Sequence, residues 1–139
     1  MRRLAALAAV AATIALGLAS RRWAGALPDA FGKYPGDTLW ATMVVFGWCA
    51  LRPRAHLRKI ATLAALTCLA IEVAKLWQAP WLVAWRHTTI GHLLLGQVFS
   101  WQNLVAYGLG VPAGIALARL LPDATLPAMP PSLARIPDA

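Results

Sequence analysis

Six polar or charged side chains within and between the apolar runs are the candidates for a functional site. They are Arg86, Glu72, Asp37, Arg21, Gln78 and His92. An arginine guanidinium recognises phosphate or carboxylate through two parallel hydrogen bonds. An ionisable side chain surrounded by lipid costs about 2.5–3.5 kcal/mol on insertion scales, so it usually has a partner or a function. The set therefore predicts a site that binds an anionic head group.

Glu72 and Lys75 are three residues apart, which makes them neighbours on one face of a helix. Either they neutralise each other, with the Lys75 ammonium reaching outward to the membrane surface, or they belong to the ligand site. Arg86 also has two possible roles, as a ligand for phosphate or as an internal partner of Glu72 or Asp37. Both roles hold if a ligand displaces the internal partner.

Asp37 follows Pro35-Gly36, an arrangement typical of a helix N-cap rather than of a catalytic acid. No GxSxG, HExxH, Walker or paired-acid signature is present, so the catalytic residues stay unknown and a non-catalytic protein is favoured.

A metal site is the other chemistry that these residues suggest. His87 and His92 are five apart, whereas a spacing of three or four aligns two ligands on one helical face. Together with Glu72 they could form a His/His/carboxylate site of the kind that zinc enzymes use, although the spacing favours it weakly. We expect no metal and no cofactor.

The composition indicates lipid as the solvent of the surrounding elements. The chain has 139 residues, of which 60% are hydrophobic and 13% charged, and its mean hydropathy is +0.61. Soluble domains are about 45–50% apolar and about 25% charged. The net charge of +8 comes from short basic runs between apolar segments, where Lys and Arg anchor helices. We therefore expect no nucleic-acid partner.

The apolar segments predict an all-α fold, a polytopic membrane helical bundle. Runs at 4–20, 36–51, 60–77 and 101–121 are read as four transmembrane helices. The piece 88–99 is short for a span and is read as an interfacial or re-entrant helix; if it spans, the count becomes five. Residues 1–121 then form the integral membrane domain, and 122–139 form a disordered, Pro-rich cytoplasmic tail.

The basic residues orient this bundle. With the N-terminus inside, the cytoplasmic Lys and Arg residues outnumber the outer ones by eight to five, which places both termini in the cytoplasm and the chain in a bacterial inner membrane. A cleaved signal peptide is the alternative for the first run. The cytoplasmic group is Arg2, Arg3, Arg52, Arg54, Arg58, Lys59, Arg119 and Arg135, and the outer group is Arg21, Arg22, Lys33, Lys75 and Arg86.

Small residues recur every four positions in the last run, at Ala106, Gly110 and Gly114. This spacing permits close contact between helices. The last helix is therefore expected to pack tightly against a neighbour.

Several ordered motifs resemble a family of short bacterial membrane proteins known as domain of unknown function 2809. They are Gly36-Asp-Thr-Leu-Trp-Ala41, Ile71-Glu72, Gln78-Ala-Pro-Trp81, Arg86-His-Thr-Thr-Ile-Gly-His-Leu-Leu-Leu-Gly96 and Asn103-Leu-Val-Ala-Tyr107. The resemblance runs from Ser20 to Gly110 and implies an architecture more than an activity.

A fainter similarity is to VanZ-like proteins, which are linked to glycopeptide resistance. The matching positions are Asp37, Glu72, Pro80, Arg86, Gly110 and Gly114. Asn103 and Tyr107 stand where that pattern has Asp and Asn, and an insertion of about residues 87–102 separates Arg86 from the last helix.

These observations lead to a small inner-membrane protein that binds an anionic lipid or lipid-linked precursor head group at its outer face. Arg86 would grip the phosphate and Glu72 would orient Arg86. One alternative is an intramembrane lipid-phosphate hydrolase with Glu72 or His92 as general base. The other is an accessory subunit whose Gly-lined last helix packs in a larger membrane complex. Membrane lipids are the expected partners, and a homo-oligomer fits all three hypotheses.

Overall fold

The structure is a computed structural model that describes residues 2–22 and 34–122, apart from the side chains of Arg21, Tyr34 and Leu93. Within these residues every regular element is a helix, which confirms the all-α prediction. The predicted tail lies outside the described residues from Asp123 onward. The helices are α1 (Arg2–Arg22), α3 (Tyr34–Leu51), α4 (Leu57–Ala74), α5 (Pro80–Arg86), α6 (Thr89–Leu95) and α7 (Trp101–Ala118).

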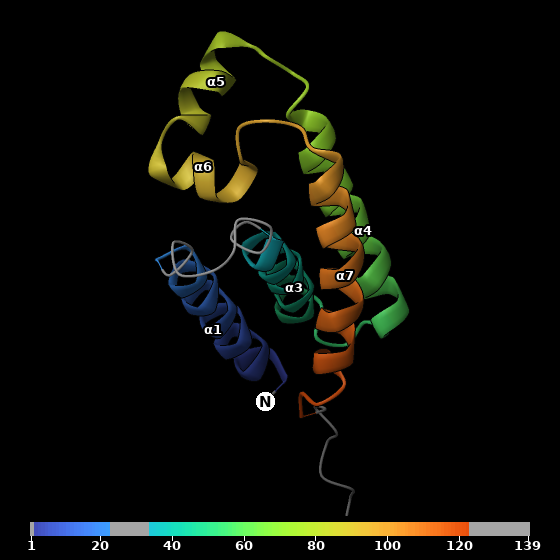
Figure 1. The fold of residues 1–139 in the computed structure, drawn as a ribbon. Helices are drawn as coiled ribbons and strands as arrows, with labels where there is room; N and C mark the ends of the chain where they lie inside the picture. Colours follow the sequence, from blue (N-terminus) through green and yellow to red (C-terminus); the bar gives the residue numbers. More distant parts are fainter. Residues whose placement is uncertain (1, 23–33, 123–139) are drawn as a thin grey trace, which may run out of the picture.

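Four long helices run side by side, and two short ones cover one end (Figure 1). Successive long helices alternate in direction, so the start of α1, the α3–α4 turn and the end of α7 lie at one end of the bundle. The short helices α5 and α6 lie at the opposite end. Helix α3 is central, because it contacts α1, α4 and α7.

A close contact joins α3 to α7, and glycine makes it possible. A Cβ on Gly110 would collide with the carbonyl oxygen of Thr38 and would lie 2.7 Å from the Cβ of Ala41. A Cβ on Gly114 would meet Val45 at 3.0 Å. The prediction of close packing by the small residues is therefore confirmed, with α3 as the neighbour. The Gly-lined face that the accessory-subunit hypothesis assigned to a partner is used within the chain.

Polar bonds fix the relative positions of the long helices. Thr42 Oγ1 donates to the carbonyl of Gly110 at 2.9 Å, and Trp48 Nε1 donates to Thr67 Oγ1 at 3.0 Å. The first bond links α3 to α7, and the second links α3 to α4. Helix α1 is held as well, because its Ala6 is fully buried.

The stretch 78–99 is more ordered than the sequence predicts. Residues 78–87, which lie between the predicted helices, contain α5, because Pro80 at the first helical position needs no N–H partner there. The predicted helix over 88–99 is confined to α6. Thr88 begins it by accepting a hydrogen bond from the Gly91 N–H at 3.1 Å, and Gly96 ends it.

The predicted N-cap at Asp37 is wrong, because α3 begins three residues earlier, at Tyr34. Asp37 therefore lies inside the first turn of the helix, where its carboxylate still interacts favourably with the helix dipole.

Judged by length and composition alone, one described helix is long and apolar enough to cross a membrane. It is the Arg2–Ser20 part of α1. The other long helices carry polar or charged residues in at least one terminal turn. In α4 these include Arg58, Lys59 and Glu72.

Candidate functional site

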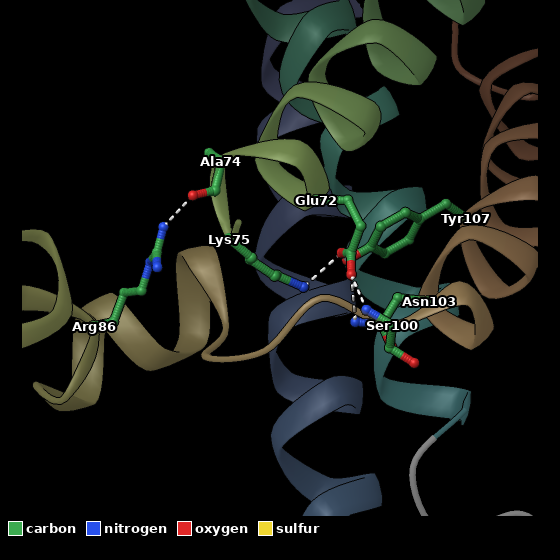
Figure 2. Close-up of polar contacts among 7 residues, drawn as sticks. All are labelled: Glu72, Ala74, Lys75, Arg86, Ser100, Asn103 and Tyr107. Carbon is green, nitrogen blue, oxygen red and sulfur yellow. Dashed lines mark hydrogen bonds and ion pairs between the residues drawn. The ribbon is translucent and has the colours of Figure 1, made fainter. Parts of the chain in front are cut away.

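A carboxylate lies fully buried where α4, α7 and the loop between α6 and α7 meet. Glu72 is 0% exposed. Its Oε2 accepts from Lys75 Nζ at 2.6 Å and from the Tyr107 hydroxyl at 3.2 Å, and its Oε1 accepts from the Ser100 backbone N–H at 2.7 Å (Figure 2). Both carboxylate oxygens are thus engaged by groups of the protein itself.

Lys75 does not reach outward, because its ammonium is buried together with Glu72. The expected pair forms, but inside the bundle rather than at the membrane surface. We call Glu72, Lys75, Asn103 and Tyr107 the polar centre. All four residues are buried.

Asn103 connects the polar centre to α3. Its amide has two orientations, since oxygen and nitrogen are interchangeable in shape. In one, Nδ2 is 3.4 Å from Glu72 Oε1. In the other, the oxygen accepts from Lys75 Nζ and the nitrogen donates to Asp37 Oδ2, both at 3.1 Å. The second orientation satisfies both amide atoms and joins half-buried Asp37 to the polar centre.

Gly96 lets the α6–α7 loop pass close to the ammonium. Its backbone has φ of 65° and ψ of −177°, a combination that essentially glycine alone adopts. A Cβ at this position would lie 3.1 Å from Cε and 3.2 Å from Nζ of Lys75. The loop can therefore continue to Ser100, whose N–H binds Glu72.

Arg86 lies apart from the polar centre, on α5 (Figure 2). Its guanidinium donates to the carbonyl oxygens of Ala74 and Trp77, at the C-terminal end of α4. A cation at this end of a helix is stabilised by the unpaired carbonyls and by the helix dipole. Arg86 is 2% exposed. Its described bonds make it a clamp between α5 and α4, and Glu72 is not among its partners in the described contacts.

The other predicted site residues are scattered. Gln78 Nε2 donates to the carbonyl of Lys75 at 2.7 Å, and His92 is exposed on α6. The side chain of Arg21 lies outside the described part. Among the described residues no three His, Cys, Asp or Glu side chains come together as a metal site.

The sequence pattern does not assign Asn103, Tyr107 or the Ser100 N–H to a site. A signal for two of them exists, since Asn103 and Tyr107 are four apart in an apolar run and so share a helix face. Nothing local indicates that this face meets Glu72.

A cavity of about 220 Å³ lies beside the polar centre, between α1, α3 and α6. Its walls are almost wholly apolar. Trp40 belongs to it and also packs against Tyr107, with ring centroids 5.4 Å apart. We call this cavity the α1/α3/α6 groove. Trp40 thus connects the groove to Tyr107, whose hydroxyl donates to Glu72.

A family model described as "Protein of unknown function (DUF2809)" matches residues 26–111, more than half of the chain. The chain belongs to the DUF2809 family. The matched region includes α3, α4, α5, α6 and the first part of α7, and hence the whole polar centre. No solved structure matches the chain. The similarity to VanZ-like proteins stays a prediction.

In this DUF2809 protein the polar centre joins three helices and a loop, and its bonds hold Glu72 and Lys75 in the buried interior. Removing one partner of a buried ion pair leaves an uncompensated charge, which strongly destabilises the fold. The polar centre therefore holds α4, α7 and the α6–α7 loop in one arrangement. Open space lies next to it, in the α1/α3/α6 groove.

Proposed function

We propose that this chain is a four-helix inner-membrane protein that binds the head group of an anionic lipid or lipid-linked precursor at its outer face, the end covered by α5 and α6. One observation carries the proposal: the polarity is inverted, with a charged pair at the centre and large apolar side chains outside. Glu72 and Lys75 are buried, whereas Leu66, Leu69 and Val73 of the same helix are 56%, 48% and 51% exposed. Water disfavours that arrangement and lipid favours it.

The same pattern continues around the bundle and supports four spans. Large exposed apolar side chains also occur on α1 and α7. Contiguous exposed apolar surface of this kind marks a membrane or partner contact in general. Examples are Leu4, Leu7, Leu16, Val105, Leu109 and Leu117.

Tryptophan supports a membrane surface at the α5–α6 end. Indole rings favour the headgroup region, where one side of the ring meets lipid and the other meets water. Exposed indoles occur at this end just after α4, on α5 and at the start of α7. They are Trp77, Trp81, Trp85 and Trp101.

The distribution of charge supports an N-in, C-in orientation. The opposite end of the bundle carries the start of α1, the α3–α4 turn and the end of α7 (Figure 1). That end holds a basic group that would face the cytoplasm. Its members are Arg2, Arg3, Arg52, Arg54, Arg58, Lys59 and Arg119. Because α1 packs against α3, a retained first helix is favoured over a cleaved signal peptide.

Among the described side chains at the outer end, the exposed arginine available to a ligand is Arg22. Lys75 and Arg86 are buried and hydrogen-bonded, whereas the Arg22 side chain is exposed at the end of α1. His87 and His92 are also exposed at this end. We therefore assign the phosphate contact to Arg22 and a supporting role to Arg86, which holds the α5–α6 end in place. Hydrolysis with Glu72 as the general base is disfavoured, because the oxygens of Glu72 are occupied by internal donors.

Two exposed histidines allow a matched test of the topology. In a chain with Cys49→Ala and Cys68→Ala, either His56→Cys in the α3–α4 turn or His87→Cys after α5 supplies one thiol. A membrane-impermeant maleimide should label His87→Cys in intact spheroplasts and His56→Cys only after permeabilisation. Equal labelling of both in intact spheroplasts would contradict the four-span topology.

Lipid retention tests the head-group site. The full chain is reconstituted in vesicles of equal parts phosphatidylglycerol and phosphatidylcholine, extracted in mild detergent and measured by native mass spectrometry. We expect an excess of phosphatidylglycerol adducts that Arg22→Gln removes. Arg58→Gln, an exposed arginine at the opposite end, should leave the excess unchanged. Equal retention of the two lipids by the unaltered chain would refute the proposal.

A further inference from the structure

We infer that the α1/α3/α6 groove holds a fatty acyl chain of an anionic phospholipid whose phosphate lies at Arg22. This inference rests on the proposed head-group function and adds to it the chemical class of the ligand and the place of its hydrocarbon part. A phospholipid chain is chosen over a polyprenyl chain because the groove has a volume of only about 220 Å³ and an unbranched chain needs less space.

The groove is suited to hydrocarbon by its lining and its size. Its walls include Ile14 and Leu18 of α1, Leu39 and Met43 of α3, and Leu94 of α6. At about 220 Å³ it is larger than an apolar cavity of about 150 Å³ that binds benzene in another protein. The groove therefore accommodates a segment of one chain.

Glycine leaves the groove open. Gly17 and Gly36 belong to its walls. A Cβ added to Gly17 would meet no atom within 4 Å, so the missing side chain leaves space that no other part of the described protein fills. A lipid chain would fill it and restore the van der Waals contacts that a void lacks.

Charge complementarity identifies the occupant as anionic. Leu18 lines the groove, and Arg22 is four residues further along α1, so the two share a helix face. The rise of 1.5 Å per residue places Arg22 about 6 Å beyond Leu18 along the axis. A chain in the groove would thus carry its phosphate to the arginine. The acidic side chain described on α3 at this end, Asp37, is bound to Asn103 in the polar centre.

Filling the groove from within the protein is the direct test. Gly17→Phe places a ring in the open space, whereas Gly47→Phe adds the same ring on α3, at a glycine that also has open space but does not line the groove. Both are reconstituted as full chains in vesicles of equal parts phosphatidylglycerol and phosphatidylcholine and measured by native mass spectrometry after mild extraction. Leu94→Trp, on the α6 wall, is the second variant if Gly17→Phe does not fold.

We expect Gly17→Phe and Leu94→Trp to lower the ratio of phosphatidylglycerol-bound to free protein about tenfold, which corresponds to about 1.4 kcal/mol. Gly47→Phe should retain the unaltered ratio. Unchanged retention by both groove variants would overturn the acyl-chain site and leave the head-group site standing. Absence of phosphatidylglycerol from the unaltered chain would overturn both, and a polyprenyl phosphate retained in preference from native membranes would overturn the choice of chain.

Discussion

Lys75 Nζ lies 2.6 Å from Glu72 Oε2, and the two side chains are 3% and 0% exposed. They occupy one face of α4, yet the groups that complete their hydrogen bonding come from α7 and the loop before it. The pair therefore couples the end of α4 to the segment that carries α6, and α6 forms one wall of the α1/α3/α6 groove. The buried pair thus holds the loop that follows one wall of this groove.

The first prediction concerns this pair. Glu72→Gln keeps the size of the side chain but leaves the Lys75 ammonium buried without its counter-charge. The free energy of unfolding should fall by about 3–5 kcal/mol. The combined variant Glu72→Gln/Lys75→Met should recover much of this loss, because no uncompensated charge remains. Unfolding of the purified protein in detergent with increasing denaturant measures the free energy of unfolding of both variants. If the value for Glu72→Gln lies within about 0.5 kcal/mol of that of the unaltered chain, the pair does not hold the bundle together.

The second prediction compares two glycines of α7. Gly110→Ala directs a methyl group into the backbone of α3, so α3 and α7 must separate and stability should fall by about 1–3 kcal/mol. Gly108→Ala points into open space and should be neutral or stabilise the helix by about 0.5–1 kcal/mol. Thermal unfolding in the same detergent measures the difference. The packing argument fails if the two variants unfold at the same temperature.

The third prediction concerns the clamp formed by Arg86. Arg86→Met retains the aliphatic length but removes the donors to Ala74 and Trp77, each worth about 1.5–3 kcal/mol as a charged hydrogen bond. Amide hydrogen exchange over α5 and α6 should become faster, while exchange in α1 and the middle of α3 should not change. His87→Ala, at the exposed neighbouring position, should leave exchange as it is. Unchanged protection of the α5 amides from exchange in Arg86→Met would show that Arg86 does not hold α5 on α4.

Much of the local structure could be predicted, because it depends on spacing along the chain. Apolar runs bounded by proline and arginine indicate the long helices to within a few residues. The three-residue interval between Glu72 and Lys75 fixes them as neighbours, and the four-residue repeat of Ala106, Gly110 and Gly114 indicates a close helix contact. Helix α5 was missed because its broken, aromatic composition resembles a loop until Pro80 is recognised as a first helical residue.

The partners of the charged side chains could not be predicted in the same way. Tyr107 and Asn103 are 35 and 31 residues from Glu72 along the chain, and only the packing of α7 on α3 and α4 turns them toward the carboxylate. The charge and length of the Arg86 side chain are compatible with several partners, so the residue type alone does not identify the partner. The position of α5 brings it to the carbonyls at the end of α4 instead of to Glu72.

By itself, the sequence determined the helical class, the positions of the long helices and the pairing of Glu72 with Lys75, since these follow from periodicity and from contacts within one or two turns. The tertiary structure decided that this pair is buried, that Arg86 binds backbone carbonyls and that open space lies between α1, α3 and α6. Those features depend on which faces of distant helices meet, and local spacing does not specify that.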